Sequence, residues 1–189
     1  IESKGGDILG TVSTGSAADS VTLSLGATIT GAVTLGASSD GSDGNDSLTL
    51  NASSITGAVN TGSAADTVSL SNASLITGDV SLGSNSDTTD GNDSLSLNAS
   101  TITGNVNTGS GADSVSVLNT STVTGNVTLG TTTDSADGAD SLTVTGTSSS
   151  SKSVITGSIA TGGGADSLDF TNATIGGAGQ TISLGSDNN

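Results

Sequence analysis

The stretch Gly36–Gly57 reads GASSDGSDGNDSLTLNASSITG, and it decides the fold. An Asp-rich loop leads into an alternating strand, SLTL, then into a corner, NASS, and then into the triplet ITG. The same order returns at Gly83–Gly104 as GSNSDTTDGNDSLSLNASTITG, and again from Gly130 as GTTTDSADGADSLTV. A block that recurs in order with its loops intact predicts an architecture of stacked repeats.

The repeat has two alternating lengths. The Ile or Val of each ITG-like triplet serves as a marker, and the markers are Ile8, Ile29, Ile55, Ile76, Ile102, Val123, Ile155 and Ile175. Successive markers are 21, 26, 21, 26, 21, 32 and 20 residues apart, so a short and a long turn form a unit of 47 residues. The 32-residue step contains GTSSSSKS at 146–153, which predicts an exposed Ser-rich loop within one repeat-built domain, residues 1–189.

Apolar residues keep a strict register within each turn. In every complete turn one Asp precedes a strand with two apolar residues, and a period of two sends both to the same face. These inward pairs are Val21/Leu23, Leu48/Leu50, Val68/Leu70, Leu95/Leu97, Val115/Val117, Leu142/Val144 and Leu168/Phe170. A turn of this size cannot bury enough apolar surface alone, so neighbouring turns must share a core. We therefore predict an all-β chain, a parallel β-solenoid (β-helix) of about eight turns that alternate between 21 and 26 residues.

Composition narrows the possible functions. Only 31% of the residues are apolar, the single aromatic residue is Phe170, and the net charge is −16. This charge disfavours nucleic acid and anionic membranes as partners and favours a cation. No apolar run is long enough to span a membrane, and no signal peptide or initiator Met is present, so we expect a mature chain or a slice of a longer one. His, Cys, Tyr and Arg are absent, so we do not expect an enzyme.

Stacked turns align equivalent Asp residues. Neighbouring carboxylates about 5 Å apart repel by roughly 1 kcal/mol per pair in water, so the column needs either hydration or cations. Ca²⁺ suits oxygen ligands in irregular geometry, and Asp in three long loops and in the short turns are the candidate ligands. The long-loop candidates are Asp40, Asp43, Asp46, Asp87, Asp90, Asp93, Asp134, Asp137 and Asp140, and the short-turn candidates are Asp19, Asp66, Asp113 and Asp166. For the short-turn set, a role in shaping turns through side-chain hydrogen bonds remains equally open.

The sequences DGNDSLTL and DGNDSLSL resemble the RTX-type calcium-binding β-solenoid repeats of bacterial secreted adhesins. This resemblance implies calcium bound between successive turns by the Asp and by carbonyls of the preceding Gly turn. Asp46 and Asp93 match the repeat fully, and Asp140 matches with Ala139 in place of Asn. The period of 21 and 26 residues departs from that family, and most short turns lack the Gly two positions before the Asp.

Two further polar sets recur once per turn. Thr residues after the marker predict an outward ladder, and Asn residues at the corners predict inward amide ladders; several of the Asn also fit the glycan acceptor pattern N-x-[ST]. The Thr set is Thr30, Thr56, Thr77, Thr103, Thr124 and Thr156, and the Asn set is Asn51, Asn72, Asn98, Asn119 and Asn172. For the Thr set, plain polar cover of a strand face is the simpler interpretation.

These observations favour a secreted, calcium-stabilised structural rod of a bacterial adhesin, cell-surface filament or surface layer, located outside the cell. One alternative is a binding module that uses its Ser/Thr faces for a surface ligand or for ice, which the resemblance implies because one region of such adhesins binds ice. A β-helix enzyme acting on polysaccharide is the third hypothesis, and the lack of suitable basic residues disfavours it.

The ends predict self-association. Ile1 lies seven residues before Ile8, as Leu48 lies seven before Ile55, so the first residues read as the closing strand of a preceding turn. Neither end shows a helical or charged cap that would cover bare strand edges. We expect copies to stack end to end through the solenoid ends, as separate chains or as tandem repeats.

Overall fold

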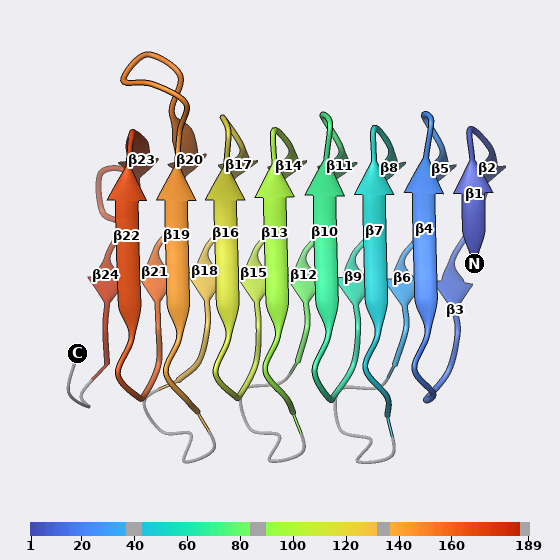
Figure 1. The fold of residues 1–189 in the computed structure, drawn as a ribbon, viewed down its shortest axis with the longest axis horizontal. Helices are drawn as coiled ribbons and strands as arrows, with labels where there is room; N and C mark the ends of the chain where they lie inside the picture. The colour runs from blue at the N-terminus through green and yellow to red at the C-terminus, as the bar shows by residue number, and fades with distance from the viewer. Residues whose placement is uncertain (37–42, 84–89, 132–136, 186–189) are drawn as a thin grey trace.

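The structure is a computed structural model, and it describes residues 1–36, 43–83, 90–131 and 137–185. Its regular elements are short parallel strands arranged in three sheets of eight strands each (Figure 1). The chain visits the three sheets, named A, B and C here, in the same order in every turn. The prediction of a parallel β-solenoid of about eight turns is confirmed.

The strands of sheet A are the longest. They are β1 (Glu2–Lys4), β4 (Ser20–Ser24), β7 (Ser47–Asn51), β10 (Thr67–Ser71), β13 (Ser94–Asn98), β16 (Ser114–Leu118), β19 (Ser141–Thr145) and β22 (Ser167–Thr171). Sheet B consists of β2 (Asp7–Ile8), β5 (Thr28–Ile29), β8 (Ser54–Ile55), β11 (Leu75–Ile76), β14 (Thr101–Ile102), β17 (Thr122–Val123), β20 (Ser153–Ile155) and β23 (Ala173–Ile175). Sheet C consists of β3 (Val12–Ser13), β6 (Val33–Thr34), β9 (Val59–Asn60), β12 (Val80–Ser81), β15 (Val106–Asn107), β18 (Val127–Thr128), β21 (Ile159–Ala160) and β24 (Ile182–Ser183).

Strand pairing reproduces the alternating period. In sheet B the marker residues lie side by side from Ile8 to Ile175, so the short and long steps of the sequence are whole turns. The strands of sheet A keep five residues in short and long turns alike from β4 to β22, so the difference in turn length lies outside them. The 32-residue step also keeps its register, with Val123 beside Ile155. Its insertion forms a small exposed hairpin in which Ser148 pairs with Ser151.

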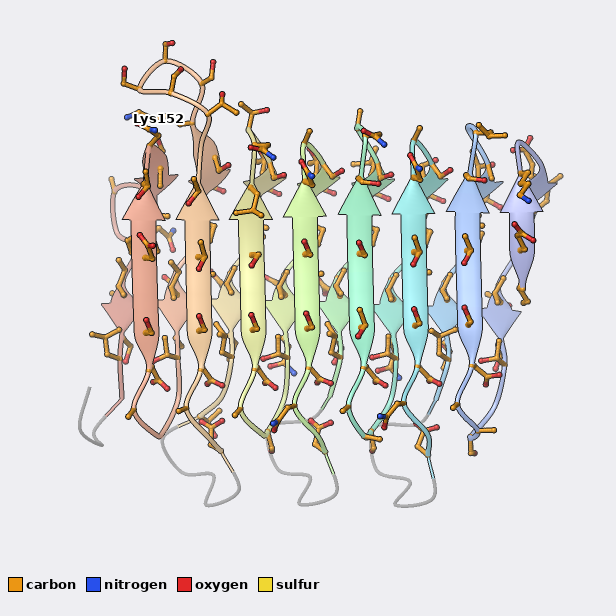
Figure 2. All side chains as sticks on the ribbon, in the orientation of Figure 1. Lys152 is labelled. Atoms are coloured by element: carbon orange, nitrogen blue, oxygen red, sulfur yellow. The ribbon has the colours of Figure 1, made fainter. Side chains whose placement is uncertain are left out.

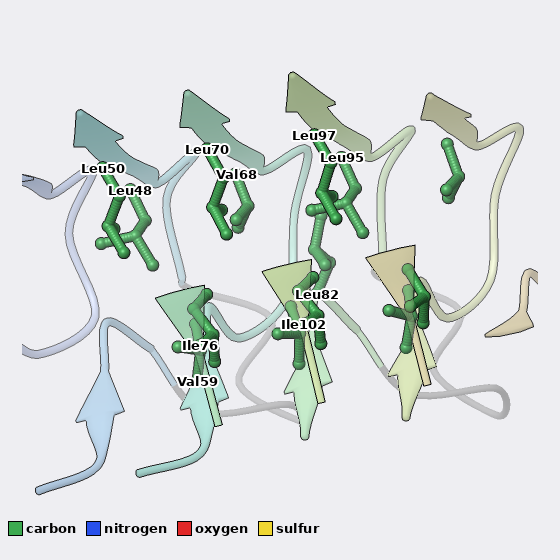
Figure 3. Packing of buried hydrophobic residues seen from close by; sticks show 14 of the residues in the cluster. Leu48, Leu50, Val59, Val68, Leu70, Ile76, Leu82, Leu95, Leu97 and Ile102 are labelled. Carbon is green, nitrogen blue, oxygen red and sulfur yellow. The ribbon is translucent and has the colours of Figure 1, made fainter. Parts of the chain in front are cut away.

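The three sheets enclose one apolar core. Leu48 and Leu50 of β7 point inward from sheet A, and Ile76 and Val59 face them from sheets B and C (Figure 3). The inward pairs are fully buried from Val21/Leu23 to Leu142/Val144, as predicted. The last pair is an exception, because Phe170 is 38% exposed on a strand with a neighbouring turn on one side only.

The prediction of inward amide ladders at the corners between sheets A and B is wrong. Asn51 and Asn98 are exposed rather than inward, and the amide of Asn72 donates to Asn51 Oδ1 on the surface at 2.8 Å. Alternation sends Leu50 inward and Asn51 outward, and Ala52 then turns the chain at φ 50°. The inward residue is therefore the Ser that follows, so the ladder consists of hydroxyls rather than amides. Its buried members are Ser53, Ser74, Ser100 and Ser121, where each of the first three donates its main-chain N–H to the Oγ of the next.

The part of the chain that the structure describes contains no helix long and apolar enough to cross a membrane.

The core generates a direct test. Replacing Ile76 with Ala removes a fully buried side chain, so we expect a loss of about 2–5 kcal/mol in the free energy of unfolding. The control is Ser69→Ala in the adjacent sheet, whose side chain points outward; its effect should stay within about 0.5 kcal/mol. Urea unfolding followed by circular dichroism measures both, and equal losses would contradict the assignment of inward and outward faces.

Candidate functional site

One Asp per turn lies at the entry to sheet A, where the chain arrives from sheet C. Its carbonyl accepts the N–H of the next turn's first strand residue, for example Ser47 N–H to Asp19 O at 2.9 Å. Its own N–H donates to the carboxylate of the next turn's Asp. These bonds are Asp19 N to Asp46 Oδ1 at 2.7 Å, Asp46 N to Asp66 Oδ1 at 2.7 Å, Asp66 N to Asp93 Oδ1 at 2.7 Å, Asp93 N to Asp113 Oδ1 at 2.8 Å, Asp113 N to Asp140 Oδ1 at 2.7 Å and Asp140 N to Asp166 Oδ1 at 3.0 Å. We call this set the aspartate ladder.

The interior of the aspartate ladder is buried. Five of its side chains, at positions 46, 66, 93, 113 and 140, are at most 2% exposed. In each of them Oδ1 is used by the ladder, whereas Oδ2 is buried with no hydrogen-bond partner among the described residues. A buried charged oxygen without a partner is costly, so each group favours gaining a proton or a cation.

Burial accordingly raises the pKa of these carboxyls. It raises the pKa to about 6 for Asp46 and Asp113, about 7 for Asp66, about 8 for Asp140 and about 9 for Asp93. The ladder hydrogen bond lowers each pKa and neighbouring carboxylates raise it, but loss of solvent is the largest cause for all five.

The core position beside the aspartate ladder alternates between turns. Thr61 and Thr108 stand in short turns, and they pair with Leu82 and Leu129 of long turns by donating from Oγ1 to the Leu carbonyl at 3.1 Å. The nearby hydroxyl lowers the pKa of the short-turn carboxyls after burial has raised it. Long-turn carboxyls have Leu at this position, which offers no hydroxyl to lower their pKa. This is one reason why Asp93 has the highest pKa.

A second set of Asp joins each long turn to the short turn after it. Asp43 Oδ2 accepts the N–H of Ser63 at 3.1 Å, and Asp90 Oδ2 accepts that of Ser110 at 3.0 Å. Asp137 Oδ2 accepts the N–H of Gly163 at 2.6 Å. These carboxylates are half-buried and raise the pKa of the adjacent ladder carboxyls by like-charge repulsion.

Paired glycines make room for the second set. A Cβ placed on Gly83 would lie 1.7 Å from Asp90 Oδ2, and one on Gly109 in the next turn would lie 2.0 Å from the same atom. The same arrangement surrounds Asp43 and Asp137. These cradles were not predicted from the sequence, although the constant spacing of seven residues between the first Gly and the Asp is a usable signal.

The candidate metal ligands are thus only partly placed. Asp40, Asp87 and Asp134 lie outside the described residues. Within the described ranges no group of three or more acidic residues surrounds a common point that could hold a metal ion. Asp19 and Asp166 are the half-buried ends of the aspartate ladder, and Thr161 Oγ1 donates to Asp166 Oδ2. Among the short-turn Asp, the side chains of Asp66, Asp113 and Asp166 accept hydrogen bonds from the turn before, whereas Asp19 Oδ2 is buried with no partner among the described residues.

The donor chemistry still fits a hard cation. The buried Oδ2 atoms of Asp46 and Asp93 have no hydrogen-bond donor among the described residues, and carboxylate oxygens are of the kind that Ca²⁺ binds. Protons satisfy the same atoms, so two kinds of cation compete for one column. Comparison of the chain with known protein families, with curated proteins and with solved structures finds no significant match.

The glycine cradle can be tested with a matched pair of variants. Gly109 and Gly15 occupy equivalent positions at φ 107° and 120°, but a Cβ on Gly15 meets nothing within 4 Å. We expect Gly15→Ala to cost about 1 kcal/mol of stability from backbone strain alone. Gly109→Ala should cost about 2–4 kcal/mol, because overpacking against Asp90 and Gly83 is added. Equal losses in urea unfolding would contradict the cradle.

The raised pKa values set the sign of a pH dependence. Between the ordinary Asp value of 3.8 and the folded values of about 6 to 9, the folded chain holds more protons than the unfolded chain. The free energy of unfolding should therefore be highest near pH 4 and fall as the pH rises toward 9 when divalent cations are removed. Denaturation midpoints in EDTA at pH 4.5, 7 and 9 measure this; a rise over that range would refute it.

An isosteric substitution assigns the effect to the aspartate ladder. Asp93→Asn keeps an oxygen for the N–H of Asp66 and removes the charge, so it should flatten the decline and raise stability at pH 8. The control is Asp79→Asn, because Asp79 is exposed and likewise accepts a main-chain N–H, that of Asn105. It should leave the slope unchanged.

Proposed function

We propose that this chain is a secreted, calcium-stabilised structural rod of a bacterial adhesin, cell-surface filament or surface layer. The observation that supports it most is the unbroken stack of three parallel sheets in constant register around one core. At about 4.8 Å per turn, eight turns give a rod roughly 35–40 Å long. Such a unit supplies length and stiffness.

Stiffness along the rod has a structural source beyond the sheets. The aspartate ladder and the Ser ladder join successive turns at two corners of the solenoid. A third ladder joins them at the Thr that follows each marker, where Thr56 Oγ1 donates to Thr30 O at 2.8 Å and Thr77 Oγ1 to Thr56 O at 2.7 Å. The pattern continues through Thr103, Thr124 and Thr156. Bending the rod would require breaking ladders on one side, so a spacer role suits this design.

Calcium enters the proposal through the aspartate ladder. Its buried Oδ2 atoms and the charge of −16 need compensation, and the two Lys are too few to supply it. Outside the cell, calcium would neutralise the column and stabilise the folded rod. In a calcium-poor interior the same repulsion would keep the chain loosely folded for export.

The outer edges of the stack support end-to-end association. Phe170 and Ile182 are 38% and 50% exposed, whereas their neighbours one turn inward, Val144 and Ile159, are at most 1% exposed. The outer edges of β22, β23 and β24 have no strand beside them among the described residues. A further turn, from a second copy or from the same longer chain, would cover these side chains and pair these edges.

Calcium dependence is the first test. Calcium at 100 times its dissociation constant should add about 2.7 kcal/mol to the free energy of unfolding and raise the melting temperature measured by circular dichroism at pH 7.5. EDTA should reverse the rise, and Asp90→Asn/Asp93→Asn should reduce it while Asp79→Asn does not. A melting transition that is the same in calcium and in EDTA rules out the structural cation.

End-to-end association is tested by electron microscopy in calcium. We expect thin, unbranched filaments with an axial repeat of roughly 35–40 Å. Phe170→Asp/Ile182→Asp should shorten or abolish them by placing charge on the end face, whereas Thr101→Asp/Thr122→Asp on the outer face of sheet B should not. A strictly monomeric protein under these conditions overturns this part of the proposal.

A further inference from the structure

A row of hydroxyls runs along the outer face of sheet A. It occupies the middle outward position of each strand from β4 to β19, and strand pairing places its members side by side. We call this the central hydroxyl row, and it consists of Thr22, Thr49, Ser69, Ser96, Ser116 and Thr143. Figure 2 shows the short outward side chains standing on this face, whose strands lie side by side in one layer.

The central hydroxyl row differs from the Thr ladder in its hydrogen bonds. In the Thr ladder each hydroxyl from Thr56 to Thr156 donates to a carbonyl one turn back. Within the described structure no hydroxyl of the central row makes a hydrogen bond to the protein. These groups are held in register, yet their donors and acceptors are directed at solvent. They are therefore available to a partner.

The outer face of sheet A also carries no charged side chain from β4 to β19. From β4 to β19 every outward residue of sheet A is Ser, Thr or Asn, apart from Leu118. Charges occur only on the end strands, where Glu2 pairs with Lys4 at 2.7 Å and Asp169 is exposed. The corner between sheets C and A carries the half-buried Asp43, Asp90 and Asp137, so two copies with a charge of −16 repel each other on approach through that corner. The strands of sheets B and C carry no outward charge in the middle of the stack either, but they are two or three residues long, so sheet A is the broadest face on which a second copy meets no like charge.

The area of the sheet A face and its hydroxyl groups both agree with pairing between two copies of this chain. Six strands of five residues cover about 500 Å², so two such faces bury roughly 1,000 Å², the lower limit of a specific interface. A hydroxyl both donates and accepts, so a Ser/Thr face is complementary to itself about a two-fold axis. Small side chains also allow close sheet-to-sheet approach. Absence of aromatic side chains on this face disfavours a glycan as the occupant.

We propose that sheet A is a lateral contact face through which two copies of this chain pair face to face, centred on Ser69 and Ser96. This inference rests on the proposed rod function, because weak lateral contacts become strong when they repeat along stacked rods. We expect a single pair of copies to be weak, with a dissociation constant of about 0.1–1 mM. Pairing through sheet A would turn single filaments into ribbons or layers.

The test is sedimentation equilibrium between 10 µM and about 1 mM at physiological salt. All samples carry Phe170→Asp/Ile182→Asp, which blocks end-to-end growth. We expect a monomer–dimer equilibrium that Ser69→Glu/Ser96→Glu weakens at least tenfold. The matched control is Thr101→Glu/Thr122→Glu, which puts the same charge on neighbouring turns of sheet B and should leave the equilibrium unchanged. Circular dichroism checks that all variants fold.

Three outcomes overturn the lateral contact. They are a monomer at every concentration, equal weakening by both Glu pairs, and a monomer whose sheet A binds ice or an insoluble neutral polysaccharide instead. Filaments of the wild-type chain without lateral pairs would refute sheet A pairing and leave the rod function intact. Absence of both filaments and pairs would count against the rod function itself.

Discussion

The hydrogen bond from each ladder Asp N–H to the carboxylate of the next turn is the constraint on which the rest of the structure depends. At this corner the chain leaves sheet C and enters sheet A, and a main-chain donor would otherwise be buried without a partner. A carboxylate supplies the acceptor for six successive turns, from Asp19 N to Asp140 N, as in Asp66 N to Asp93 Oδ1 at 2.7 Å. Because the bond requires one Asp at one place in each turn, it fixes the register of the strands that follow.

Using a buried carboxylate as the hydrogen-bond acceptor has an energetic cost in every part of the column. In the five buried carboxylates only one oxygen is used by the ladder, and the other is buried with no partner among the described residues, so the column is stable when a proton or a cation neutralises it. Short turns ease the problem locally, whereas in long turns a second Asp raises the pKa of the ladder carboxyl further. Short turns place Thr beside their carboxyl, and long turns extend a second Asp into a glycine cradle that bonds the next turn. The length of the turn, the residue beside the ladder carboxyl and the number of Asp residues therefore alternate together from turn to turn.

Periodicity made the fold predictable, because turn length, apolar pairs and marker residues all repeat on the scale of single turns. Periodicity was not sufficient where the packing of neighbouring residues decides which side chain is buried. The corner position of Asn51 predicts an inward amide, but one left-handed residue at Ala52 moves the following Ser inward instead. Phe170 follows the inward pattern and still is exposed, since burial needs a turn on both sides. Likewise, the Asp positions could be predicted as a column, whereas their burial and single-oxygen bonding depend on three-dimensional packing.

The central claim is that buried carboxyls, each bonded through one oxygen, tie the turns together. Its most direct test is the titration of individual Asp side-chain carboxyl carbons by nuclear magnetic resonance in calcium-free buffer. The account predicts that Asp66, Asp93 and Asp140 titrate with pKa values of about 7, 9 and 8. Titration of all three near the ordinary value of 3.8 would show hydrated, independently charged groups and would contradict it.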